Sequence, residues 1–153
     1  MKFKISNKQK PLLLEGGTHV DDRGVINYIN DMSFFKFKRM YVIENFQENF
    51  VRAWHGHKKE NKVFFCISGT FKVAAVKIDS FSNPSKNLIP KEFILSSTSP
   101  KFLYIPKGYA NGLTNLSSNA KLIVFSDKLL EESLNDDYRF EYDFWDIWKI
   151  NYR

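Results

Sequence analysis

The clearest structural signal in the chain lies in residues 51–71, VRAWHGHKKENKVFFCISGTF. An alternating run, 51–54, and an apolar run, 63–67, flank a polar segment that contains His55 and His57. Short runs of aromatic and β-branched residues that end in turn residues are typical of β-strands. The Ser68-Gly69 pair then predicts a hairpin turn into the next strand. We therefore expect an all-β fold that carries both histidines on or beside a strand.

Similar runs recur on both sides of this stretch. We predict strands near residues 25–28, 40–43, 51–54, 63–67, 71–78, 93–95, 102–105 and 121–125. Eight or more short strands at this spacing predict a β-sandwich or a β-barrel, with a longer loop over residues 79–87. Late in the chain, Asp127 is expected to cap a short helix over 129–134, and the aromatic segment 142–148 to pack back on the barrel.

Length and composition predict one domain over residues 1–153. The chain is 43% hydrophobic and has a formal net charge of +6, which lies within the globular range. Its one cysteine, Cys66, has apolar neighbours and is expected to be buried. Residues 63–67 are apolar on both faces, which favours a homodimer that buries the outer face of the barrel. The absence of a long apolar run predicts a cytoplasmic protein with no membrane contact.

The basic residues are spread thinly along the chain, which argues against nucleic acid as a partner. Four of them nevertheless fall close to the histidines: Arg52, Lys58, Lys59 and Lys62. This local positive charge favours an anion site for a phosphorylated small molecule.

His55 and His57 are two positions apart, so on a strand their side chains leave the same face and can enter one cavity. The alternative is an exposed pair of polar groups at a strand end. A pair of this kind with a nearby carboxylate also suggests a divalent metal. Glu60, however, follows His57 by only three positions, and the downstream Asn111 offers an amide, which is a poor substitute for imidazole on a transition metal. We therefore expect no metal and no cofactor.

A histidine without metal can act as a general base at cellular pH. A cation such as Lys62 or Arg52 would lower its pKa and stabilise an enolate. Strict alternation from His55 points Arg52 to the opposite face, so its use requires a bulge or strong twist in the strand. Lys62 opens the next strand and has no such conflict, although an exposed lysine is the alternative.

Several motifs resemble, in this order, those of the dTDP-4-dehydrorhamnose 3,5-epimerases, which are nucleotide-sugar cupins. They are Asp21-Asp22-Arg23-Gly24, Arg52-Ala53-Trp54-His55, Lys62 with Gly69, residues 105–112 (IPKGYANG), and Asp143 before Ile147 and Trp148. The segment 52–73 is equally similar to the dTDP-sugar 3,4-ketoisomerases. Both resemblances imply a metal-free, dimeric cupin jelly-roll barrel with a short C-terminal helical segment. They also imply a dTDP-linked 4-keto-6-deoxy sugar as substrate, made for surface polysaccharide.

The epimerase resemblance implies that His55 is the base and that Lys62 and Arg52 stabilise the enolate oxygen. It also implies that Asp143 orients His55 and that Arg23 binds the nucleotide diphosphate. The ketoisomerase resemblance moves the base to His57, with His55 assisting.

The chain departs from the epimerase pattern in two places. It has no tyrosine over 120–126 to return a proton to the opposite face of the sugar, and Asn111 replaces a histidine that would contact substrate. Tyr109 could supply the missing acid if it enters the cavity. We favour a metal-free epimerase acting by enolisation. A ketoisomerase, a non-catalytic sugar-nucleotide-binding cupin and a metal-dependent oxygenase or isomerase are the alternatives.

Overall fold

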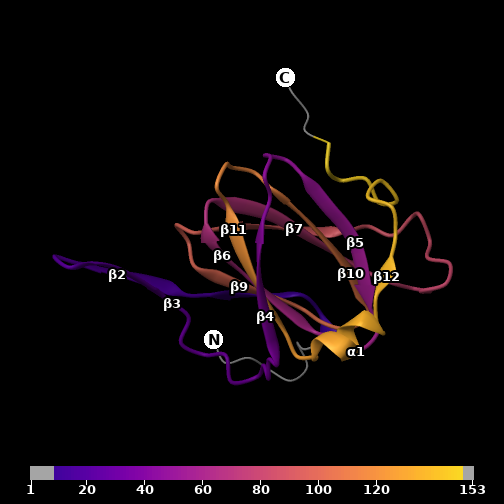
Figure 1. The fold of residues 1–153 in the computed structure, drawn as a ribbon, viewed down its shortest axis with the longest axis horizontal. Coiled ribbons are helices and arrows are strands. Elements are labelled where there is room, and N and C mark those ends of the chain that lie inside the picture. The colour runs from indigo at the N-terminus through magenta and orange to yellow at the C-terminus, as the bar shows by residue number, and fades with distance from the viewer. Residues whose placement is uncertain (1–8, 150–153) are drawn as a thin grey trace.

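The computed structural model describes residues 9–149. Two five-stranded antiparallel sheets face each other and form its body (Figure 1). The first sheet has the strand order β1 (Leu12–Glu15), β9 (Lys101–Ile105), β6 (Lys62–Ser68), β11 (Lys121–Ser126) and β4 (Arg39–Glu44). The second has the order β12 (Tyr138–Arg139), β5 (Val51–His57), β10 (Tyr109–Asn115), β7 (Thr70–Lys77) and β8 (Lys91–Ser96).

The main hydrophobic core lies between the two sheets. Its buried side chains come from both of them and include Phe64, Phe71, Leu95, Leu103 and Leu122. Burying the inner face of each strand in this way is the main source of stability for such a fold. Cys66 lies in this core with 2% of its surface exposed, and burial raises the pKa of its thiol. Its predicted burial is confirmed.

All eight predicted strands are present, and 79–87 is a loop as expected. The predicted hairpin at Ser68-Gly69 is wrong. Gly69 does make a tight turn, with φ of 68°, but β6 pairs with β9 and β11 whereas β7 pairs with β8 and β10. The turn therefore carries the chain from one sheet to the other, which a local turn signal cannot distinguish from a hairpin.

Helix α1 (Leu130–Leu134) is present, but Asp127 does not cap it. Its N-cap is Leu129, whose backbone N–H donates to the Glu132 carboxylate at 2.8 Å. The Asp127 carboxylate instead accepts hydrogen bonds from the backbone and side chain of Asn61. The capping prediction fails because this carboxylate is already occupied at the start of β6.

The aromatic segment after β12 packs on the outer face of the second sheet, as predicted. Trp145 and Trp148 are buried there, with ring centres 5.6 and 5.2 Å from that of Trp54. This packing fixes the C-terminal segment beside β5, the strand that carries both histidines.

The hairpin of β2 (Gly17–Asp21) and β3 (Gly24–Tyr28) extends away from the two sheets (Figure 1). Its apolar side chains are open to solvent, since Val20, Val25 and Ile26 are each 58–66% exposed. No helix between residues 9 and 149 is long and apolar enough to cross a membrane.

Candidate active site

A cavity of about 370 Å³ opens between the two sheets. The first sheet contributes β4 and β6, and the second contributes β5 and β10. The lining residues are Tyr41, Val42, Ile43, Glu44, Arg52, His55, Lys62, Phe64, Asn111 and Leu113. Four residues predicted from the sequence therefore meet in one cavity: Arg52, His55, Lys62 and Asn111.

Arg52 reaches this cavity because β5 contains the irregularity that its use requires. His55 pairs with Asn111 and Arg52 with Leu113, so three steps along β5 match two along β10. An extra residue in one strand restores Arg52 to the face of His55. Gly112 lies opposite this point, where a Cβ would come within 2.6 Å of the Ala53 Cβ. A glycine is therefore needed for the strands to approach here.

Arg52 is also held in place by a side-chain contact. Its Nε donates to the Asn45 Oδ1 at 2.7 Å, and its guanidinium lies 5.9 Å from the centre of the Phe50 ring. A cation fixed in this way at the rim of a cavity can bind an anionic group without first being ordered.

His55 faces a carboxylate, but not the predicted one. Its Nδ1 lies 3.5 Å from Asp137 Oδ1, and Asp137 in turn accepts from Arg139 Nε at 2.8 Å. Burial and the nearby charge of Lys62 lower the pKa of His55, although Asp137 acts in the opposite direction. His55 is therefore neutral, and able to accept a proton, at cellular pH.

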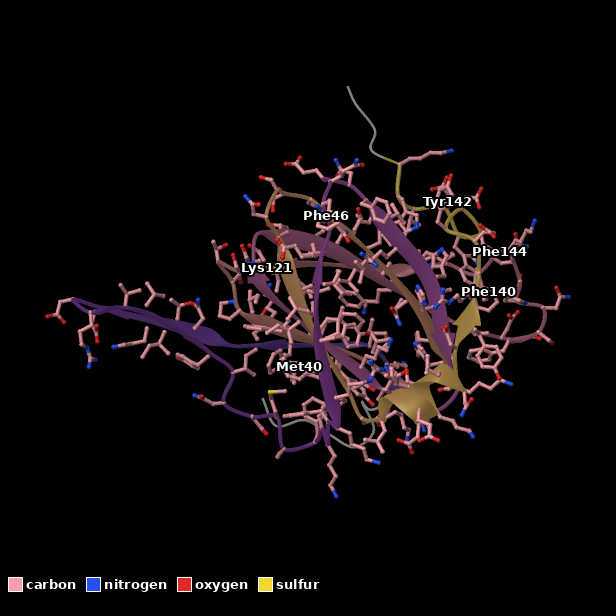
Figure 2. All side chains as sticks on the ribbon, in the orientation of Figure 1. Met40, Phe46, Lys121, Phe140, Tyr142 and Phe144 are labelled. Atoms are coloured by element: carbon pink, nitrogen blue, oxygen red, sulfur yellow. The ribbon has the colours of Figure 1, made fainter. Side chains whose placement is uncertain are left out.

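Asp143 does not orient His55, and this prediction is corrected. Asp143 is exposed, and it follows Tyr142, whose carbonyl accepts a hydrogen bond from the Trp54 indole. Trp54 belongs to the outer cluster of the second sheet, whereas His55 lines the inner cavity. Figure 2 shows Tyr142 and Phe144, the neighbours of Asp143, on the outside of the barrel beyond β12. Asp137 was missed because the sequence around it carries no distinguishing signal.

His57 lies deeper than His55, with 4% of its surface exposed. Its Nδ1 is 2.7 Å from the Asp136 carbonyl oxygen and 3.2 Å from Glu60 Oε2. Its Nε2 is buried and has no hydrogen-bond partner in the part of the chain that the structure describes. Burial and the charge of Lys62 lower the pKa of His57. His57 is thus also neutral at cellular pH. It is not among the residues that line the cavity, although Lys62, whose charge acts on its pKa, is.

The tyrosine in the cavity is Tyr41 and not Tyr109. Tyr41 lies on β4, and the Lys62 ammonium is 6.0 Å from its ring centre. Tyr109 lines a separate cavity of about 320 Å³ with Lys58, Lys77 and Lys107, and burial raises the pKa of its hydroxyl. The inward position of Tyr41 could have been found from the alternation of residues 39–44, since Tyr41 and Ile43 share one face.

Arg23 is not brought to the cavity of its own chain. It lies at the tip of the β2–β3 hairpin, where its side chain is 81% exposed and pairs with Asp21 at 2.6 Å. A role in binding the substrate would therefore require another copy of the chain.

No three His, Cys, Asp or Glu side chains within residues 9–149 are arranged to hold a metal ion. Glu60, the acidic residue nearest to the histidine pair in sequence, contacts Arg39, Ser126 and Ser133 as well as His57.

A protein-family model described as "FdtA: WxcM-like, C-terminal" matches residues 12–149. No curated protein matches the chain. Among solved structures, the chain is similar to QdtA, a sugar 3,4-ketoisomerase from Thermoanaerobacterium thermosaccharolyticum in complex with TDP. The identity is 25% over 89% of this chain and 91% of that chain, with a TM-score of 0.67.

Two further solved structures share the architecture. The WlaRB TDP-quinovose 3,4-ketoisomerase from Campylobacter jejuni is 24% identical over 88% of this chain and 96% of that chain, with a TM-score of 0.65. The dTDP-4-dehydrorhamnose 3,5-epimerase from Elizabethkingia anophelis is 20% identical over 99% of this chain and 87% of that chain, with a TM-score of 0.75. These likenesses confirm the predicted cupin jelly-roll barrel.

Proposed function

The chain belongs to the FdtA family of WxcM-like C-terminal domains, and we propose that it is a 3,4-ketoisomerase of a dTDP-linked 4-keto-6-deoxy sugar. Similar solved structures include the ketoisomerase QdtA in complex with TDP-4-keto-6-deoxyglucose, a TDP-quinovose 3,4-ketoisomerase and a dTDP-4-dehydrorhamnose 3,5-epimerase, which supports the enzyme class. The ketoisomerases also match this chain over nearly their whole length.

One observation carries the choice of reaction. His55 and His57 leave the same face of β5 and both lie close enough to Lys62 for its charge to lower their pKa values. Two bases on one side of a sugar are suited to moving a proton between neighbouring carbons along a single face. An epimerase instead needs an acid on the opposite face.

In the proposed reaction His57 removes the proton from C3 of the sugar, and the C4 carbonyl oxygen gains a proton. This gives an enediol between C3 and C4. A proton then returns to C4 and the C3 hydroxyl loses its proton, which leaves the keto group at C3. Lys62 and Arg52 stabilise the negative charge that develops on the oxygens, and His55 assists from the cavity wall.

Epimerisation remains the second candidate because of Tyr41. Tyr41 lies on the first sheet and His55 on the second, and both line the cavity. A base and a hydroxyl on facing sheets could exchange protons with opposite faces of a sugar. Tyr41 would then replace the tyrosine that residues 120–126 lack.

The test is incubation with dTDP-4-keto-6-deoxyglucose in deuterated water, followed by NMR. The ketoisomerase predicts a 3-keto product with deuterium at C4 and an untouched proton at C5. Deuterium at C5 with the keto group still at C4 would instead establish the epimerase. If the protein binds the sugar nucleotide but no carbon exchanges its proton, the protein is a non-catalytic sugar-nucleotide-binding protein.

We also propose that the protein acts as a homodimer. The hairpin exposes Val20, Val25 and Ile26, and the outer face of β4 exposes Met40 and Val42. A second copy of the chain could bury these exposed apolar residues. In a dimer, Arg23 of one copy could reach the cavity of the other copy and bind the diphosphate of the substrate there. Light scattering should therefore give twice the chain mass, and Ile26→Asp should reduce it.

A further inference from the structure

Glu60 is a buried carboxylate that the proposed reaction leaves without a role. It lies between β5 and β6 and is 1% exposed. Its Oε1 accepts from Arg39 Nη2 at 3.0 Å and from the Ser126 hydroxyl. Its Oε2 accepts from the Ser133 hydroxyl at 2.8 Å and lies 3.2 Å from His57 Nδ1. Every oxygen of this carboxylate is therefore occupied by a donor.

These contacts keep Glu60 ionised. Burial alone would disfavour the charged form, but Lys62, the Ser126 hydroxyl and His57 together hold the pKa of Glu60 below its ordinary value. The Arg39 guanidinium pairs with it directly. A negative charge is thus held beside His57 in a site closed to water, where its effect is stronger than at the surface.

The surroundings of Nδ1 determine which tautomer of His57 is present. Nδ1 faces two groups, the Asp136 carbonyl and the ionised Glu60 carboxylate, and both can only accept hydrogen bonds. The proton of the neutral ring must therefore be on Nδ1. Nε2 then carries the lone pair, and it is the nitrogen with no partner between residues 9 and 149.

Three charged groups act on the His57 ring. Lys62 on β6 lowers its pKa, whereas Glu60 and Asp136 raise it, and burial lowers it most. The Asp136 carboxylate is itself occupied, because it accepts from the backbone N–H groups of residues 58, 59 and 60. Glu60 is therefore the carboxylate that touches the ring.

We propose that Glu60 is a positioning residue for His57, which holds the ring with its proton on Nδ1 and stabilises the imidazolium that forms when Nε2 takes a proton. The Asp136 carbonyl shares the first task, but the charge comes from Glu60. The carboxylate of a Ser-His-Asp triad plays the same part behind its catalytic histidine. Here the carboxylate follows the histidine by three residues in the sequence. Its catalytic consequence rests on the proposed function, whereas the tautomer and the charge effect do not.

The competing explanation is that Glu60 is only a structural clamp. Its contacts join β4, β11 and α1 through Arg39, Ser126 and Ser133. If Glu60 only joins these elements, removing its carboxylate should lower the free energy of unfolding but leave the tautomer and the pKa of His57 unchanged. The experiment must therefore measure the ring itself.

Long-range proton–nitrogen NMR of the full chain, with His57 assigned by its loss in His57→Gln, provides that measurement. Above the His57 pKa we expect a protonated Nδ1 and an unprotonated Nε2. In Glu60→Gln, His57 should titrate at lower pH than in the wild type. The exposed Glu92→Gln, which removes a carboxylate on β8, should leave the titration unchanged. A proton on Nε2 in the wild type, or an unshifted titration in Glu60→Gln, overturns the proposal.

Kinetics add a second readout if the enzyme is active. Glu60→Gln should lower kcat by about 10- to 100-fold, less than the roughly 100- to 10,000-fold that a general acid or base itself contributes, because Glu60 acts through His57. KM should change less than about twofold, and the acidic limb of the pH profile should move to lower pH. If Glu60→Gln fails to fold, Arg39→Met with Glu60→Gln removes both charges of the ion pair and is measured instead. Absence of keto-sugar turnover would reject the proposed function, while the NMR result would still decide the role of Glu60.

Discussion

His55 and His57 lie two residues apart on one face of β5, yet their surroundings differ. The His55 side chain is 36% exposed, and its carboxylate partner Asp137 is 21% exposed at 3.5 Å. The His57 side chain is 6% exposed, and Glu60 is fully buried at 3.2 Å. Each carboxylate is backed by an arginine, Arg139 or Arg39. Strand alternation therefore determines which face of the sheet a side chain occupies, but its burial determines how strongly the neighbouring charges act on it.

The largest expected effect separates the two rings directly. We predict that His57→Gln lowers kcat by about 1000-fold or more, because it removes the proposed base. His55→Gln should cost only about 10- to 100-fold, because His55 assists without taking the proton from C3. Loss of solvent deuterium incorporation at C4 measures both variants. A larger loss in His55→Gln would reverse the assignment of the base.

The second prediction concerns the cation that the two histidines share. Lys62→Met should lower kcat by about 100-fold, because a preorganised charge next to the developing oxyanion is lost. Both histidines should then titrate at higher pH, since Lys62 lowers the pKa of each. Lys121→Met, at the exposed start of β11 (Figure 2), is the matched control and should retain full activity. If the acidic limb of the kcat–pH profile does not move in Lys62→Met, the proposed action of Lys62 on both histidines is contradicted.

The third prediction uses the pH dependence of stability. Because the folded-state pKa values of His55 and His57 are lowered, the unfolded chain binds more protons than the folded chain once the pH falls below about 6.5. The free energy of unfolding should therefore decrease on acidification from pH 7.5 to 5.5. Urea unfolding at both values tests this, and His57→Gln should show a smaller decrease. An equal decrease in the variant would mean that other groups dominate.

The smallest expected effect compares two carboxylates. Asp137→Asn should lower kcat by about three- to tenfold, since the Asp137 pair with His55 is partly exposed and weakened by solvent. Asp143→Asn should leave kcat within about twofold, because Asp143 is exposed on the outer side of the second sheet. Steady-state kinetics of the two variants test this. A larger loss of kcat in Asp143→Asn than in Asp137→Asn would support Asp143, as first expected from the sequence, as the residue that orients His55.

Local signals in the sequence were sufficient for part of this site. The strand pattern around His55 and the position of Lys62 predicted two cavity residues, and the need for a bulge at Arg52 was foreseen. Strand β10 was not predicted, because residues 109–115 (YANGLTN) are mostly small or polar and lack the apolar alternation of a strand. Its Gly112 is required by close strand approach, which only the folded chain reveals.

The partners of the two histidines could not be predicted in the same way. Glu60 meets Arg39 and Ser133, which are 21 and 73 residues away along the chain. Asp137 reaches His55 only because β12 pairs with β5. Such contacts depend on topology and register, and neither leaves a periodic pattern in the sequence.

Cys66 offers a practical consequence of the core described above. It is the one cysteine of the 153-residue chain and lies between the two sheets on β6, one of the strands that line the cavity. A soluble thiol reagent can therefore attack it only when the sheets separate. When reclosing is faster than labelling, the labelling rate of the unmodified protein thus reports the fraction of molecules whose barrel is open. A nucleotide sugar that binds only the closed barrel should slow this labelling in proportion to its occupancy.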